Sequence, residues 1–248
     1  MKILFHANCQ GEGLIHFMKY SRDFHKLSVR TTLVYLLELG YTSIEESEEN
    51  IDWADVIFYH YVRSLKTPES QSAELVPLSV YNNSGYYLSS SKRDDWDQVF
   101  KREKSHGIIN AARMAVSTFD MGYRRRHQKN IERMKEKEVN EGVPESMRLS
   151  NFILGNDINE QQSLTYNHPT SYILFDWANI ILRRLDLQEI DSGMRSELCR
   201  DLNAAKLPCV DFICTGARRN LGLNYGGSRQ DDSECFKLAV SEIRKGIR

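Results

Sequence analysis

The stretch Lys2-Ile-Leu-Phe-His6-Ala-Asn8-Cys9-Gln10-Gly11-Glu-Gly13 opens the chain and decides how the rest is interpreted. Its first residues have strand character, a polar turn with glycines follows, and an apolar pattern of helical spacing begins at Leu14. The pattern therefore predicts a strand, a turn and a helix, with Cys9 at the turn. In an open α/β sheet, ligands bind at the carboxyl ends of the strands, so this turn is the first candidate site.

Two interpretations of Cys9 follow from its position. A cysteine at the start of a helix lies near the positive end of the helix dipole, which lowers the thiol pKa towards the thiolate. Alternatively, Cys9 is a small apolar residue packed beneath the turn. The neighbours Asn8, Gln10 and Gly11 favour the first interpretation, because such a turn offers N–H donors to an anion.

Composition excludes several classes of protein. The chain has 248 residues, of which 41% are hydrophobic, enough for a substantial core. A formal net charge of −1 argues against general nucleic-acid binding. We find no apolar run of about 18 residues and no signal-peptide pattern, so we expect a cytoplasmic protein without a membrane span. The five cysteines form no CxxC motif, so we expect neither a disulfide framework nor a metal site.

Further strand predictions place polar groups at the same edge of a sheet. Leu27–Thr32 and Ala54–Tyr59 have strand character, and the second leads into His60, Tyr61 and Arg63. In a parallel sheet these side chains emerge beside Cys9, whereas a plain surface loop is the alternative.

A third candidate strand, Leu78–Tyr81, runs into the glycine-containing turn Asn82–Tyr87, which either supplies backbone donors to a site or is an ordinary turn. The acidic segment Glu45–Asp52 is predicted to be a solvated connector. The glycine- and arginine-rich stretches Thr215–Asn220 and Gly222–Arg229 are predicted to be flexible surface loops, with phosphate binding as the alternative. The remaining pattern predicts helices at 33–39, 108–119, 124–141 and 171–185.

These elements predict an α/β fold, with a short parallel sheet flanked by helices and a mostly helical carboxyl-terminal half. No repeat or low-complexity linker divides the chain, so we expect a single domain over residues 1–248. Residues 1–90 would hold the sheet and residues 91–248 the mainly helical part.

A second informative stretch is Tyr166-Asn167-His168-Pro169-Thr170, directly before the predicted helix from Ser171. Pro169 suits a first helical turn, which places Asn167 or His168 at the helix cap. A histidine there is kept neutral and suits a general base, although a half-buried structural imidazole explains it too. A cysteine and a histidine are the minimum for an activated nucleophile.

Taken together, Asn8-Cys9-Gln10-Gly11 and Asn167-His168-Pro169-Thr170 resemble the opening and late motifs of the WcbI family of capsular polysaccharide biosynthesis proteins. The resemblance covers about residues 1–190. It implies a coenzyme A-binding α/β protein, with a core distantly like SGNH esterases or flavodoxin. It further implies acetyl transfer from acetyl-coenzyme A to a hydroxyl of a sugar or oligosaccharide.

The resemblance also implies roles for individual residues. Cys9 would be the nucleophile or lie nearest the thioester, with Asn8 and Gln10 as polar neighbours and His168 as general base. The SGNH pattern of Asp-x-x-His before a final helix is missing, so no third member of a triad is assigned. The backbone amide of Gln10 or Gly11, together with a side-chain amide from Asn8 or Asn83, is expected to stabilise the oxyanion. The expected coenzyme A-binding residues are Arg63, His60, Lys92, Arg93, Arg126 and Asn167.

Two other classes of function remain open at this point. A thiol esterase or deacetylase would use the same cysteine and histidine with water as acceptor. A non-catalytic module would bind coenzyme A or a glycan without turnover. The sequence names neither the sugar nor the oligomeric state.

Overall fold

The computed structural model describes residues 1–61, 66–82, 87, 96, 98, 101, 107–117, 122–151, 153, 160–165, 168–207 and 212–246. The chain divides into two compact units. Unit 1 comprises Met1–Tyr81, Met134–Phe152 and Pro169–Leu207, and unit 2 comprises Asn82–Arg133, Ile153–His168 and Pro208–Arg248. The expectation of a single domain over residues 1–248 stays a prediction.

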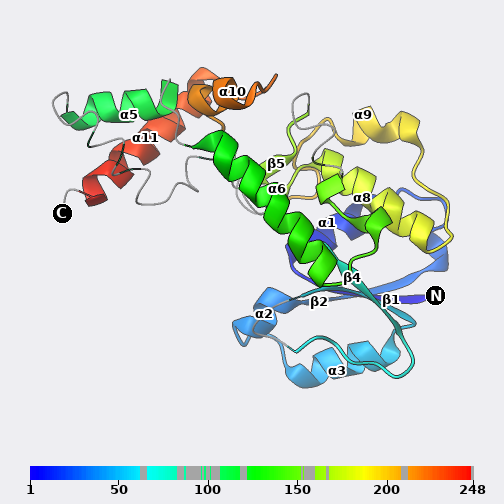
Figure 1. The fold of residues 1–248 in the computed structure, drawn as a ribbon. Helices are drawn as coiled ribbons and strands as arrows, with labels where there is room; N and C mark the ends of the chain where they lie inside the picture. Colours follow the sequence, from blue (N-terminus) through cyan, green and yellow to red (C-terminus); the bar gives the residue numbers. More distant parts are fainter. Residues whose placement is uncertain are drawn as a thin grey trace. The chain divides into compact units, whose positions relative to one another are not determined.

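Unit 1 is built on a parallel sheet whose order, among the described residues, is β2-β1-β3-β4 (Figure 1). Phe5 in the middle of β1 lies opposite Thr31 on one side and Phe58 on the other. The strands are β1 (Lys2–Ala7), β2 (Ser28–Leu33), β3 (Val56–His60) and β4 (Glu74–Leu78). The predicted α/β fold with a short parallel sheet flanked by helices is confirmed.

The position predicted for the strand at Leu78–Tyr81 is wrong, because β4 ends at Leu78. This strand contains Pro77, which lies opposite Tyr59 of β3. Proline has no N–H to donate and is tolerated on a strand with one neighbour, as β4 has here. Because proline is rare inside strands, the sequence pattern placed the strand after Pro77 and not around it.

The two faces of the sheet are covered by different helices of unit 1 (Figure 1). One face carries α1 (Cys9–Met18) and α8 (Ser171–Arg184), which pack on each other. A Cβ added at Gly11 would lie 2.8 Å from the Cβ of Ala7, so α1 approaches β1 closely. The other face carries α3 (Ile44–Trp53), and α2 (Val34–Glu38) follows β2.

The acidic segment is helix α3, so the prediction of a solvated connector was wrong. Ser43 caps the helix by accepting a hydrogen bond from the Glu46 N–H at 3.1 Å. Carboxylates in the first turn favour a helix because they face its positive end. Ile51 and Trp53 pack against a buried cluster that includes Leu4 and Ile57 of the sheet.

Shorter elements and one helix complete unit 1. They are the 3-10 turns at Phe24–Lys26, Glu145–Met147 and Ser192–Met194, the helix α9 (Arg195–Leu198) and the end of α6 (Tyr123–Asn140). Arg195 of α9 pairs with Asp176 of α8 through two hydrogen bonds, at 3.0 and 2.9 Å. This bidentate ion pair fixes α9 against α8.

Unit 2 is mainly helical. Its core joins α5 (Gly107–Ser117), α10 (Thr215–Leu221) and α11 (Arg229–Gly246) around Ala111, Ala115 and Ala239. The predicted surface loop at 215–220 was wrong, because this segment forms α10, whose Thr215 hydroxyl donates to Asp232 at 2.5 Å. A short two-stranded sheet pairs β5 (Ser163–Thr165) with β6 (His168–Pro169).

No helix within the described residues is long and apolar enough to cross a membrane.

The close approach of α1 to β1 gives a first prediction. Gly11→Ala should lower the free energy of unfolding by about 1–2 kcal/mol, because overpacking outweighs the better helix propensity of alanine. The exposed Glu12→Ala in the same helix is the control and should change it much less. Denaturant unfolding measures both, and a stabilised Gly11→Ala protein would contradict the packing.

Candidate functional site

The carboxyl ends of β1, β3 and β4 meet at one edge of the sheet in unit 1. Asn8 follows β1, His60 ends β3, and Tyr81 lies three residues after the end of β4. Hydrogen bonds join all three to the start of α1. The prediction that His60 emerges beside Cys9 is confirmed, and the expected site lies at the edge where parallel sheets bind ligands.

Asn8 connects β1, β3 and α1. As the N-cap of α1, it accepts a hydrogen bond from the Gln10 N–H through Oδ1 at 2.9 Å. Its own backbone N–H donates to Nδ1 of His60 at 3.2 Å. The residue before Cys9 is thus held from both sides, so the start of α1 has one defined position on the sheet.

Gln10 is fully buried and pairs with the backbone of Tyr81. Its Nε2 donates to the Tyr81 carbonyl at 3.2 Å, and its Oε1 accepts from the Tyr81 N–H at 3.0 Å. The carboxamide therefore supplies hydrogen-bond partners to the N–H and the carbonyl of Tyr81, which lies beyond the end of β4. In this geometry the side chain of Gln10 is a clamp between α1 and the segment after β4.

The segment after β4 is also held by Glu138. This carboxylate is buried and accepts a hydrogen bond from the Ser79 hydroxyl at 2.5 Å. The backbone N–H of Ser150 donates to it at 3.2 Å, and the Ser150 hydroxyl donates as well. Several donors compensate for the burial of a charge, so the path from Ser79 to Tyr81 is fixed at both ends.

His60 is buried and stacks on Trp177 of α8, with ring centroids 6.4 Å apart. Burial lowers the pKa of His60 to about 3, and the nearby Lys137 and His6 act in the same direction, whereas the Ser79 backbone opposes them. The imidazole is therefore neutral at pH 7, with Nδ1 accepting from Asn8. Its burial favours a positioning role for His60.

The Cys9 thiol is half-buried, and its pKa is raised. Burial is the main cause and Glu12 adds to it, whereas the backbone amides of Cys9 and Gln10 act in the opposite direction. The prediction that the helix amino terminus lowers this pKa was wrong, because desolvation of the thiolate outweighs the helix. At neutral pH Cys9 is a thiol that needs a base before it can act as a nucleophile.

The expected oxyanion donors at the start of α1 are already in use. The Gln10 N–H donates to Asn8 Oδ1, and the Gly11 N–H donates to the Asn8 carbonyl at 2.9 Å. An amide engaged in this way cannot also serve an oxyanion without breaking its bond. The expectation for these two amides was therefore wrong for this geometry.

His168 lies in β6 and is buried, and burial lowers its pKa, so the ring is neutral at pH 7. The predicted helix cap was wrong, because the N-cap of α8 is Thr170 and Pro169 precedes it in β6. Cys9 belongs to unit 1 and His168 to unit 2, so the pairing of the two stays a prediction.

Of the other residues predicted to bind coenzyme A, the structure describes only Arg126. Arg63, Lys92, Arg93 and Asn167 lie outside the described residues. Arg126 is half-buried in α6, and its guanidinium lies over the Tyr123 ring at 5.0 Å from the centroid. No group of three or more metal-ligating side chains occurs among the residues that the structure describes.

Sequence reasoning missed Glu138 and Trp177 as supports of this edge. Glu138 lies in a highly charged helix and Trp177 in an apolar one, so neither differs from its neighbours in the sequence. Only their burial against Ser79 and His60 distinguishes them.

Comparison with known proteins places the fold. No protein-family model matches the sequence, and no curated protein matches it. A solved structure does match, with a TM-score of 0.54 over 100% of this chain and 98% of that chain, at 14% identity. It is described as WcbI, a novel polysaccharide biosynthesis enzyme, in a native form without a disulfide bond between coenzyme A and one of its cysteines.

The two chains share a fold. The predicted resemblance to WcbI is thereby confirmed at the level of architecture and over the full length, including the tail after residue 190 that the motifs did not cover.

The clamp by Gln10 gives a second prediction. Gln10→Glu keeps the shape of the side chain but removes the Nε2 donor to the Tyr81 carbonyl, so the free energy of unfolding should fall by at least about 2 kcal/mol. Gln71→Glu makes the same change at an exposed position and should stay within about 0.5 kcal/mol. Equal stability of the two variants would contradict the clamp.

The buried neutral His60 gives a third prediction. In the unfolded chain a histidine takes up a proton below about pH 6.5, whereas folded His60 does so only near pH 3. Above about pH 6.5 the neutral ring therefore costs no stability. As the pH is lowered further, the unfolded chain binds a proton that folded His60 does not. The free energy of unfolding then falls by about 1.4 kcal/mol per pH unit near pH 5 because of this residue. His60→Gln should show a shallower fall between pH 7 and 5 in denaturant unfolding, and an unchanged slope would refute the buried neutral ring.

Proposed function

We propose that this protein transfers an acetyl group from acetyl-coenzyme A to a sugar hydroxyl in polysaccharide biosynthesis. The observation that carries the proposal is the Cys9 thiol, half-buried at the start of α1 on the ligand-binding edge of the sheet. The fold supports it, because the similar structure is described as a polysaccharide biosynthesis enzyme and its description names coenzyme A beside a cysteine.

The proposed reaction begins with His168 taking the proton from the Cys9 thiol. A base is needed because the pKa of Cys9 is raised, and a histidine with a lowered pKa is free of its proton at pH 7. The thiolate attacks the thioester carbonyl, the bond to the coenzyme A sulfur breaks, and that sulfur takes the proton from His168. Cys9 now carries the acetyl group.

In the second half, His168 takes the proton of the sugar hydroxyl, whose oxygen attacks the acetyl carbon on Cys9. The bond to the Cys9 sulfur breaks, and the thiol recovers its proton from His168. An alternative route omits the acetylated cysteine: His168 deprotonates the sugar hydroxyl, whose oxygen attacks the acetyl carbon of acetyl-coenzyme A directly. The bond to the coenzyme A sulfur breaks, that sulfur takes the proton from His168, and Cys9 only lines the site. The raised pKa of Cys9 is compatible with this shorter route.

The other residues of the proposed site either position the start of α1 or bind coenzyme A. Asn8, Gln10 and His60 position the start of α1 through the hydrogen bonds described above. Phosphate groups of coenzyme A require cationic and amide partners, for which we propose Arg63, Lys92, Arg93, Arg126 and Asn167.

The fourth prediction tests the two reacting residues. On the covalent route, Cys9→Ser and His168→Ala should each reduce acetyl transfer to a panel of sugars by at least about 100-fold, through loss of the nucleophile or the general base. On the direct route only His168→Ala should do so. Cys199→Ser, which removes a buried thiol in unit 1, is the control and should retain activity. Full activity of both test variants would end the assignment.

Mass spectrometry of the protein quenched during turnover separates the two routes. An acetyl group on Cys9 supports the covalent route, and its absence during rapid turnover supports direct transfer. Turnover of acetyl-coenzyme A that does not depend on a sugar would instead favour a hydrolase. A melting temperature unchanged by coenzyme A would count against the cofactor itself.

A further inference from the structure

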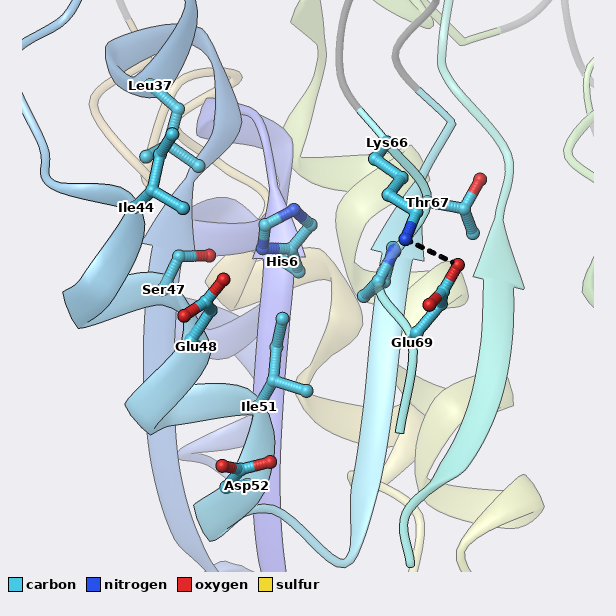
Figure 2. A pocket seen from close by; sticks show the side chains of 11 residues that line it. His6, Leu37, Ile44, Ser47, Glu48, Ile51, Asp52, Lys66, Thr67 and Glu69 are labelled. Carbon is cyan, nitrogen blue, oxygen red and sulfur yellow. Dashed lines mark ion pairs between the residues drawn. The ribbon is translucent and has the colours of Figure 1, made fainter. Parts of the chain in front are cut away.

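A cleft of about 500 Å³ opens on the α3 face of the sheet in unit 1, and the site around Cys9 does not use it (Figure 2). His6 of β1 contributes its side chain to it, the inner side of α3 forms one wall, and residues 66–69 form another. The volume falls within the range of roughly 300–1,000 Å³ that is usual for small-molecule sites.

His6 is the first indication that the cleft binds a ligand. The residue is only 5% exposed, and its Nδ1 has no hydrogen-bond partner among the described residues. Figure 2 shows its ring between the side chains of α3 and Lys66. A buried nitrogen without a partner is unfavourable, so a ligand that forms a hydrogen bond with it binds more tightly.

The state of His6 limits what this ligand can be. Burial lowers the pKa of His6 to about 4, so the ring is neutral at pH 7 and cannot attract an anion by charge. A neutral imidazole nitrogen either donates or accepts, depending on the tautomer. A hydroxyl group both donates and accepts, so it pairs with Nδ1 in either tautomer.

The charges around the cleft limit the ligand further. Three carboxylates, those of Glu48, Asp52 and Glu69, face one ammonium, that of Lys66, which pairs with Glu69 at 2.8 Å. The excess of negative charge disfavours phosphate groups, and therefore coenzyme A. Carboxylates accept hydrogen bonds from hydroxyl groups and attract amines.

Apolar side chains complete the lining. Leu37, Ile44 and Ile51 lie among the polar groups, and Ile44 is 74% exposed at the rim. A sugar ring offers matching chemistry, since its hydroxyl groups point outward around a ring whose C–H groups are apolar.

We propose that this cleft binds a sugar without phosphate groups, and prefers one that carries an amine. A hydroxyl of the sugar pairs with Nδ1 of His6, and the carboxylates of Glu48 and Asp52 hold further hydroxyl groups or the amine. The cleft lies on the opposite face of β1 from α1, so sugar binding there does not depend on acetyl transfer by Cys9.

Binding is tested with glucosamine, glucose and glucose 6-phosphate, by saturation-transfer NMR and by calorimetry on the full chain. We expect glucosamine to bind most tightly, glucose more weakly and the phosphate least, because of the net negative charge. Binding of none of the three, or tightest binding of the phosphate, overturns the proposal.

Two variants place the binding in this cleft. His6→Leu removes the buried nitrogen and should weaken glucosamine binding about tenfold. Glu48→Lys lies at an exposed position, so folding is preserved, and it should weaken glucosamine about tenfold and abolish the preference over glucose 6-phosphate. Glu49→Lys makes the same charge change one residue along α3, outside this cleft, and should bind like the wild type within about twofold.

If Glu48→Lys and Glu49→Lys bind glucosamine equally, the sugar binds elsewhere and the proposal is overturned, even where His6→Leu fails to fold. Acetyl transfer is measured separately on the same variants. Loss of sugar binding in the cleft with intact coenzyme A turnover, or the reverse, distinguishes a failure of this proposal from a failure of the acetyltransferase proposal.

Discussion

The buried pairing of the Gln10 carboxamide with the backbone of Tyr81 is the constraint on which the edge of the sheet depends. A parallel sheet leaves the backbone groups beyond its strand ends without ladder partners, and here a side chain from α1 satisfies them. Because Asn8 is tied to His60 in the same turn, one short segment of α1 fixes the exits of three strands. The position of Cys9 is therefore set by hydrogen bonds that do not involve its thiol.

Burial also determines the protonation states of the proposed site residues at pH 7. Desolvation raises the pKa of Cys9 and lowers those of His60 and His168, so all three groups favour their neutral forms at pH 7. A neutral thiol needs a base, and a neutral histidine is able to act as one. In the proposed mechanism, the thiolate of Cys9 therefore forms only during the reaction.

Strand β1 serves two regions because its side chains alternate between the faces of the sheet. Phe5 and Ala7 meet α1, whereas Leu4 packs towards α3 and His6 lines the cleft there. One short strand therefore leads into the turn that holds Cys9 and also lines a cleft with His6, whose Nδ1 has no hydrogen-bond partner among the described residues. The two regions are proposed to bind ligands of different charge. The region around Cys9 is proposed to meet the phosphate groups of coenzyme A, whereas the excess of carboxylates in the cleft disfavours phosphate groups.

The sequence by itself determined the elements whose signals are local: β1 with the start of α1, β3, α8 and the α/β class of the fold. Apolar periodicity and capping residues act over a few neighbours, so they can be read from the chain. Tertiary structure decided the rest. It turned an acidic segment into α3, placed β4 around Pro77, and reversed the expected pKa shift of Cys9. It also paired Gln10 with a residue 71 positions away. Burial and such distant partners depend on how the whole chain packs, and no local pattern in the sequence carries that information.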